Sequence, residues 1–325
     1  HLKKYFILLM KLIRVLKFAV PSTLLTMIAG AIIIYPERYI SSCLQGFAMW
    51  AECVLPSLFP FMVITLIMIK SGFAEKASLP LKKVTGLFNL PPAAAVCFII
   101  SICSGYPAGS KCVLEFFENG SISAKDAKKL SALCSTSGPL FIIGSVGVKM
   151  LGDKSAGWKI LLAHFQSVLI IALIISFFSK KDGDADLKRA PVKGNLLYDS
   201  FYGAVVSVAV AGGFIAFFAV TAQILSDFNF LIAFEKLFAL FTDERSARAV
   251  SLGLVEVTVG CRTLSAAGGS LSVPLAGFLI TFGGASILMQ QYAYFGKAGV
   301  PPLYFVGVKL AQATACFLLL LLICA

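Results

Sequence analysis

The sequence predicts an all-α polytopic membrane protein, an inverted repeat with two re-entrant helical hairpins and broken helices. Composition is the first reason, since 58% of the 325 residues are hydrophobic and only 14% are charged. About a quarter of the residues of an average soluble domain are charged, and the mean hydropathy here is +0.90. The second reason is a pair of interrupted apolar stretches, one in each half, at 104–111 and 253–262. Such pairs are typical of transporters built from inverted repeats.

The first interrupted stretch ends an apolar run that is too short to cross a bilayer. A helix over 93–103 would span about 16 Å, at about 1.5 Å per residue, and the hydrocarbon core is about 30 Å thick. The run ends in Ser-Gly-Tyr-Pro-Ala-Gly-Ser-Lys at 104–111, where Gly105 and Pro107 disfavour a continuing helix. Non-helical backbone at membrane depth occurs only inside protein or beside water. We therefore expect a re-entrant hairpin.

The N-terminal unit is expected to comprise residues 1–51. Its first apolar run, 18–35, follows a basic cluster without acids: Lys3, Lys4, Lys11, Arg14 and Lys17. The positive-inside rule therefore places the N-terminus in the cytoplasm. Ala29-Gly30-Ala31 resembles a signal-peptidase site, but the apolar run continues beyond it, so we expect an uncleaved anchor. Residues 36–50 are expected to form a short outer stretch with an interfacial helix.

The first repeat is predicted at 52–179. After an inward crossing at 54–69 and the hairpin, Ser123 is expected to cap a helix that has Asp126 at its third position. That helix leads into a polar break at 135–139, after which 140–148 completes the outward crossing and 160–178 returns inward. Lys149, Lys154 and Lys159 fit this topology poorly, because they crowd a short outer loop.

A cytoplasmic linker is predicted at 180–199 and a second, inverted repeat at 200–325. The second repeat is expected to cross at 201–225 and to enter a hairpin that breaks at 260–262. A crossing at 274–292, broken at 282–284, and a final crossing at 303–324 follow. Each half then has three crossings and one hairpin, and this odd number inverts the second half. The protein is therefore expected to be a multi-pass protein of the cell membrane with its C-terminus outside the cytoplasm.

Several functions are disfavoured. The net charge of +12 does not indicate nucleic-acid binding, because the basic residues lie in loops between apolar runs. Nine cysteines form no C-x-x-C pair, and there are only two histidines, so neither a metal site nor a cofactor is expected. A near match to a phosphate-binding loop at 147–155 has one residue too many and no preceding strand. Since no credible catalytic set appears, we do not expect an enzyme.

The interrupted stretches carry recognisable motifs. In the first half these are Ser104-Gly-Tyr-Pro-Ala-Gly-Ser-Lys111, Ser137-Gly-Pro-Leu-Phe-Ile-Ile-Gly144-Ser-Val-Gly147 and Ala163-His164-Phe165, and in the second half Gly253-Leu-Val-Glu256, Gly260-Cys261, Phe282-Gly-Gly284 and Gln290. From about Leu44 to the C-terminus the chain resembles the sporulation integral membrane protein YlbJ family. The resemblance implies a nucleoside-recognition or Gate domain, related to concentrative nucleoside transporters and to the membrane part of ferrous-iron transporters. The family name implies a link to sporulation.

The predicted substrate-binding residues lie at the interruptions. They are Ser104, Gly105, Tyr106, Pro107, Lys111, Ser137, Gly138, Glu256, Arg262 and Gln290. Charges at membrane depth usually face a cavity or a partner. Structural interpretations remain open for several of them: Lys111 could pair with Glu115, and Glu256 could neutralise Arg262. Lys309 could snorkel or pair with a carboxylate, and His164 could be a packing histidine and not a proton carrier.

The expected function is to bind or move a small polar solute, a nucleoside or an organic anion, by alternating access. The anion hypothesis depends on Lys111 and Arg262 outnumbering Glu256 near the hairpin tips. One alternative is a non-transporting assembly or scaffold factor for the spore envelope, and another is an intramembrane enzyme acting on a lipid-linked substrate. The expected partners are membrane lipid and the solute, not nucleic acid, and a homo-oligomer stays open.

Overall fold

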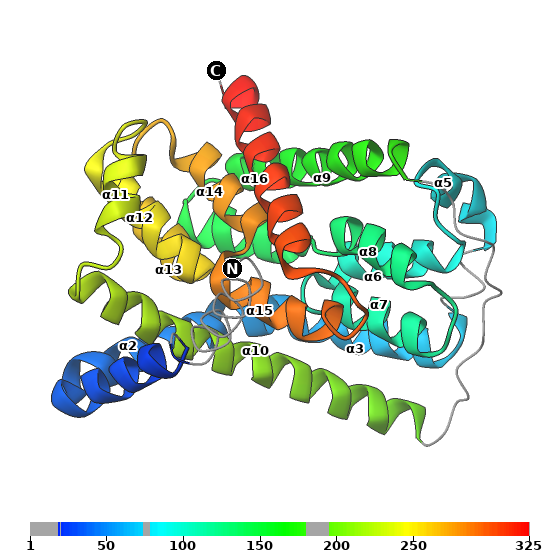
Figure 1. The fold of residues 1–325 in the computed structure, drawn as a ribbon, viewed down its shortest axis with the longest axis horizontal. Helices are drawn as coiled ribbons and strands as arrows, with labels where there is room; N and C mark the ends of the chain where they lie inside the picture. The colour runs from blue at the N-terminus through cyan, green and yellow to red at the C-terminus, as the bar shows by residue number, and fades with distance from the viewer. Residues whose placement is uncertain (1–18, 20, 74–78, 180–194, 325) are drawn as a thin grey trace, which may run out of the picture.

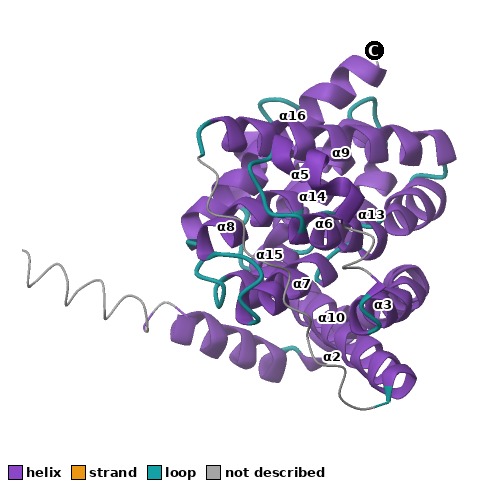
Figure 2. Cartoon of the chain, turned by 90° about the vertical axis from the view of Figure 1, so that its right-hand side faces the viewer, coloured by secondary structure: helices purple, strands orange, loops and turns teal. Residues whose placement is uncertain are grey.

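The computed structural model describes residues 19, 21–73, 79–179 and 195–324. Regular structure in the described residues is helical throughout (Figures 1 and 2). Five described helices are long and apolar enough to cross a membrane. The predicted all-α polytopic membrane fold is therefore confirmed. The basic N-terminal cluster and most of the predicted linker lie outside the described residues.

The first long helix is continuous where the sequence suggested two segments. After the apolar helix Pro21–Ile34, α2 (Pro36–Met49), a π-helical turn η1 (Trp50–Val54) and α3 (Leu55–Lys70) form one helix of 35 residues. The expected separate interfacial helix is thus wrong. Pro56 lies in the first turn of α3, where a missing N–H is tolerated. The carbonyl oxygen of Cys53, in the π-helical turn before Pro56, accepts a hydrogen bond from Ser145 Oγ at 2.6 Å. This carbonyl therefore has a partner although the helix is irregular here.

The first hairpin is confirmed. Two short elements, η2 (Leu79–Leu81) and α5 (Lys82–Leu87), precede it. Its arms are α6 (Ala93–Ser104) and α7 (Ala108–Glu118), separated by Gly105, Tyr106 and Pro107. Next comes α8 (Ala124–Leu133), which begins with the predicted capping box of Ser123 and Asp126.

The expected break after α8 is also present. It is followed by η3 (Phe141–Met150), which is π-helical, and by α9 (Lys154–Phe177).

The second half repeats this order of elements. It contains α10 (Leu196–Asp227), α11 (Ile232–Phe238), the hairpin α12 (Glu244–Val255) and α13 (Val257–Ala267), the broken pair α14 (Ser272–Phe282) and α15 (Gly284–Phe295), and α16 (Pro302–Cys324). The predicted break at 282–284 is confirmed, since Gly283 is left-handed with φ of 94°.

The predicted hairpin break at 260–262 is wrong, because those residues lie inside α13 and the chain turns at Glu256. Gly260 instead allows close packing within the hairpin. A Cβ at this position would lie 2.8 Å from the backbone nitrogen of Gly253 and 3.1 Å from the carbonyl oxygen of Ala249. The glycine therefore brings two helix backbones together and does not bend the chain.

The two hairpins approach the centre from opposite ends. Figure 1 shows α6 and α7 at the right of the molecule, α12 and α13 at the left, and α15 between them. At one end, Asn89 donates to the carbonyl oxygens of Ser176 and Ser179, which joins the region before α6 to the end of α9. At the other end, Arg38 at the start of α2 forms an ion pair with Asp227 at the end of α10. This arrangement accords with inverted repeats, whose superposition stays a prediction.

The buried apolar side chains form two main groups. One lies among α3, α6, α7, α8 and α10, and it includes Met62, Val113 and Leu130. The other lies among η3, α9, α12, α13, α14 and α16. Both groups flank the region where the hairpins end, so the hairpin tips are supported by packed side chains on either side.

Sidedness can be tested by labelling single cysteines in a cysteine-free background. We expect a reagent that stays outside the cell to modify Asp243→Cys, in the loop before α12, and not Asp184→Cys, in the predicted cytoplasmic linker. Labelling both after permeabilisation is the control for reactivity. The reverse pattern in intact cells would overturn the predicted orientation.

Candidate functional site

A cavity lies where both hairpin tips and the first helix break meet. It is lined from the first half by Val54, Ser57, Leu58, Cys103, Ser104, Gly105, Tyr106, Ser137, Gly138, Leu140 and Phe141, and from the second by Ala211, Ile215, Glu256, Val257, Thr258, Ile287 and Gln290. Its volume of about 50 Å³ holds only a few water molecules, since each needs at least about 10–15 Å³ on this scale. The site is thus a narrow space between the two halves.

The first hairpin tip rests on the first helix break. Gly105 has φ of 69° and ψ of −167°, a conformation open essentially to glycine alone. A Cβ on Gly105 would lie 2.5 Å from the backbone nitrogen of Gly138. Beside this contact, Ser101 Oγ and Thr136 Oγ1 are 2.8 Å apart. Two glycines therefore let the tip and the break touch through their backbones.

Glu256 forms the second hairpin tip. It ends α12 and also caps α13, because its Oε2 accepts hydrogen bonds from the Val259 N–H at 2.8 Å and from the Thr258 hydroxyl. The side chain is fully buried, and Oε1 has no hydrogen-bond partner among the described residues. One carboxylate oxygen thus fixes the tip, and the other is left free at the cavity.

The second break rests on the second tip in the same manner as in the first half. A Cβ on Gly284 would lie 2.6 Å from the carbonyl oxygen of Gly253, near the end of α12. Across the halves, the Tyr106 hydroxyl donates to the carbonyl oxygen of Ile280 on α14 at 3.3 Å. Tyr106 therefore connects the first tip to the half-helix before the second break.

His164 on α9 links both breaks. Its Nε2 accepts from the Ser137 N–H at 3.1 Å, so that nitrogen carries no proton. The neutral ring must then carry its proton on Nδ1, which lies 2.9 Å from Thr281 Oγ1 and donates to it. Both ring nitrogens are used, which supports the packing interpretation of this histidine.

Two buried side chains of α16 hold the end of α8. Lys309 Nζ donates to the carbonyl oxygen of Ser135 at 2.7 Å, and Gln312 Nε2 donates to that of Ala132 at 2.6 Å. The last carbonyls of a helix lack partners within it, and the helix dipole favours a cation there. Lys309 and Gln312 therefore act as caps supplied by the other half of the chain.

Most of the predicted site residues lie at the cavity: Ser104, Gly105, Tyr106, Ser137, Gly138, Glu256 and Gln290. The others do not line it. Pro107 is the N-cap of α7, Lys111 lies further along that helix near Glu115, and Arg262 lines a separate groove. Glu256 is consequently the only charged residue among the described residues of the lining, and the excess of positive charge expected at the tips is not found there.

Other lining residues were missed. Thr258 could have been found from its position two residues after Glu256. The apolar residues of α3 and α10, such as Leu58 and Ile215, carry no sequence signal, because they resemble every other apolar position of a long helix.

The chemistry of the cavity is that of a polar binding site. Ser137 Oγ, like Glu256 Oε1, is buried without a hydrogen-bond partner, and buried polar groups without partners are costly. No group of three or more metal-ligating side chains occurs in the part of the chain that the structure describes. A solute that offers hydrogen-bond donors and acceptors would satisfy both atoms.

Comparison with known proteins gives one relative. The chain is 25% identical to sporulation integral membrane protein YlbJ of Bacillus subtilis (strain 168) over 328 residues, which cover 90% of this chain and 80% of the relative. No family model and no solved structure matches. The likeness over nearly the whole chain confirms the resemblance that the motifs indicated.

Proposed function

We propose that this membrane protein, which is similar to YlbJ over nearly its whole length, binds a small polar solute between its hairpin tips and moves it across the cell membrane by alternating access. The relative is named for sporulation, and we extend that link to this chain as part of the proposal. The protein itself performs no chemical step on the solute in this proposal.

The observation that carries the proposal is the carboxylate oxygen Oε1 of Glu256, which has no hydrogen-bond partner among the described residues and lines the same cavity as the hydroxyls of Ser137 and Tyr106. Glu256 and Ser137 belong to different halves, and both are buried at one cavity. Non-helical backbone from the tips and the first break surrounds them, as is usual for solute sites in transporters with broken helices. Burying a carboxylate oxygen without a partner costs free energy, and a bound solute that donates to Glu256 would offset that cost.

The small size of the cavity supports movement of the hairpins. A solute larger than a few water molecules fits only if a tip moves away from its break. Each tip contacts the break of its own half through glycine backbone, at Gly105 with Gly138 and at Gly253 with Gly284. Such contacts involve little interlocking of side chains, and each hairpin could therefore withdraw as a unit to open the cavity towards its own side.

The charge of the lining favours an uncharged solute over an organic anion. An anion would face Glu256, and the cations Lys111 and Arg262 are not in the lining. A nucleoside or another compound with several hydroxyl groups would instead donate to the carboxylate. The anion hypothesis therefore loses its support, and the nucleoside hypothesis is retained.

The test is binding and uptake by purified, reconstituted protein across nucleosides, organic anions and divalent metal ions. We expect wild-type protein to bind a neutral polar member of the panel. Glu256→Gln should weaken that binding by roughly 10-fold to 100-fold, the value of a hydrogen bond to a charged group. Glu118→Gln, at an exposed position of α7, is the matched control and should bind normally.

Two outcomes would contradict the proposal. Binding of a solute that is equally strong in Glu256→Gln would remove the cavity from the mechanism. Failure of every solute in the panel, with a folded protein, would favour the scaffold alternative.

A further inference from the structure

A second, open hollow lies between the long helices and the second hairpin. It is lined by Gln45 and Met49 of α2, Gln223 of α10, Arg245, Arg248 and Leu252 of α12, and Val259, Arg262, Thr263, Ala266 and Ala267 of α13. We call it the arginine groove. Its volume is about 550 Å³, within the range of about 300–1,000 Å³ typical of ligand pockets. It shares no lining residue with the cavity at the hairpin tips.

The charge in the arginine groove is one-sided. Among the described residues, three arginines line it and no acid does. The described ion pairs use the nearby acids elsewhere, since Asp227 pairs with Arg38 and Glu52 pairs with Lys149. None of the three arginines forms an ion pair with a described residue.

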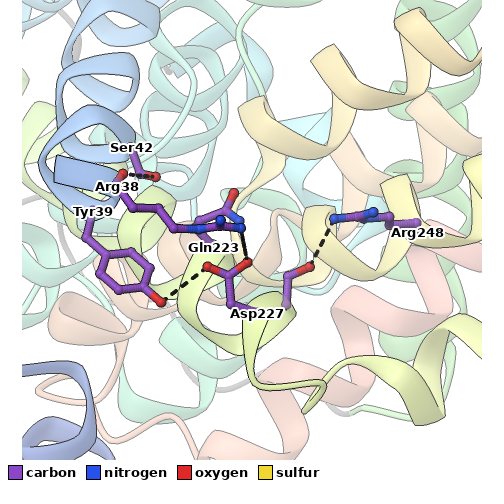
Figure 3. A network of polar contacts seen from close by, with 7 residues as sticks. Arg38, Tyr39, Ser42, Gln223, Asp227 and Arg248 are labelled. Atoms are coloured by element: carbon purple, nitrogen blue, oxygen red, sulfur yellow. Dashed lines mark hydrogen bonds and ion pairs between the residues drawn. The ribbon is translucent and has the colours of Figure 1, made fainter. Parts of the chain in front are cut away.

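Figure 3 shows the partners of Asp227, which is hydrogen-bonded to the groove residue Gln223. Asp227 accepts from Arg38 at 2.6 Å, from Gln223 at 2.8 Å and from Tyr39 at 3.2 Å. Arg248 points towards this network but reaches only the hydroxyl of Ser226, at 3.4 Å. The guanidinium group thus keeps most of its donors free.

Arg245 and Arg248 lie in the first turns of α12, whose N-terminus is capped by Asp243 and has Glu244 in its first turn. These two acids already interact with the positive end of the helix dipole, so a bound anion would be attracted mainly by the arginines themselves. Arginine also presents a planar fork of donors that suits phosphate oxygens.

The rest of the lining is suited to a lipid. Between the arginines lie apolar or small side chains, among them Met49, Leu252 and Val259. Gln45 and Met49, four residues apart, share the face of α2 that lines the groove, and Ile40, Leu44 and Phe47 are exposed on other faces of this helix, which is apolar enough to span the membrane. A molecule that joins a phosphate to an acyl chain would satisfy both kinds of surface.

We propose that the arginine groove binds the headgroup of an anionic phospholipid, with Arg245, Arg248 and Arg262 contacting the phosphate. The lipid would bridge α2 and α10 to the hairpin of α12 and α13. This site is separate from the proposed solute site and does not depend on transport.

The experiment measures the lipid retained by protein reconstituted into bilayers of phosphatidylcholine with a minor fraction of phosphatidylglycerol, then purified again and analysed by mass spectrometry. Wild-type protein should retain phosphatidylglycerol selectively. Each arginine changed to glutamine should lower that retention about fivefold, and R245Q/R248Q/R262Q should abolish the selectivity. The control K154Q/K159Q/K297Q removes the same charge elsewhere and should retain the lipid as wild type does.

Equal retention by the arginine triple variant and wild type would overturn the proposal, as would equal losses in both triple variants. If the triple variant does not elute as a folded species, R245Q and R262Q alone supply the graded comparison. A final arm adds inorganic phosphate in zwitterionic lipid. Thermal stabilisation by phosphate that requires the arginines, without selective retention of phosphatidylglycerol, would assign the groove to a soluble anion and overturn the lipid assignment.

Discussion

Replacing Gly105 with alanine is expected to destabilise the protein by roughly 2–5 kcal/mol, because two costs add. The φ of 69° with ψ of −167° is strained for any residue with a Cβ. That Cβ would also lie 2.5 Å from the backbone nitrogen of Gly138, and overpacking against backbone typically costs about 1–3 kcal/mol. The thermal midpoint of the detergent-purified protein, followed by size-exclusion chromatography after heating, measures the effect.

Gly213→Ala is the matched control for Gly105→Ala. Gly213 lies within α10, and a Cβ there meets nothing within 4 Å. Since alanine is the better helix former by about 1 kcal/mol, this variant should be as stable as wild type or more so. If both variants melted together at the wild-type temperature, the backbone contact between the first tip and the first break would be contradicted.

Replacing Lys309 with alanine is expected to cost about 3–5 kcal/mol, because it removes a buried side chain and leaves the Ser135 carbonyl oxygen without its donor. Lys309→Met keeps most of the volume and removes only the donor, so its cost should be about 1–3 kcal/mol. The difference between the two variants therefore separates packing from hydrogen bonding. Thermal midpoints of the purified variants provide the measurement.

Lys297→Met serves as the control for Lys309, because Lys297 is exposed at the start of the loop after α15. It should change the midpoint little. A Lys309→Met protein as stable as wild type would show that the bond to Ser135 contributes nothing to stability. The role of Lys309 as a cap of α8 would then be contradicted.

The first hairpin could be predicted because its turn contains residue types that break helices. Gly105 and Pro107 follow an apolar run of half the membrane thickness, and the tip lies where they do. The second tip was placed too late because its turn contains no glycine or proline. Glu256 has an extended backbone between the two helices, and its carboxylate caps the second of them. An N-cap side chain can therefore end one helix and start the next without a glycine or proline.

Glycine and proline also misled in other places. Gly260 was taken for a break, although its role is to allow close approach of Gly253 within the hairpin. Pro56 and Pro60 belong to a residue type that usually interrupts a helix, yet both lie within α3. Sequence alone cannot distinguish these uses, since each depends on which distant groups are nearby, as Ser145 is for the carbonyl oxygen of Cys53.

The charged residues of the site were only partly predictable. Their depth in the membrane was inferred from apolar runs, which place a residue along the membrane normal and not around a helix. Lys111 and Arg262 are at helix positions that do not face the cavity, whereas Glu256 does. Lys309 could be recognised from the sequence as a charge at membrane depth. Its partner could not be, because Ser135 is 174 residues away in the chain and local sequence patterns do not connect residues so far apart.

The caps on α8 have a consequence for biosynthesis. The ribosome completes the first half well before it reaches Lys309 and Gln312, and until then the carbonyl oxygens of Ser135 and Ala132 lack the donors that α16 supplies. We therefore expect nascent chains that stop before α16 to insert into the membrane yet stay open at the first break. Such truncated products would be exposed to membrane proteases, so the final helix acts as the step that completes the assembly of the whole protein.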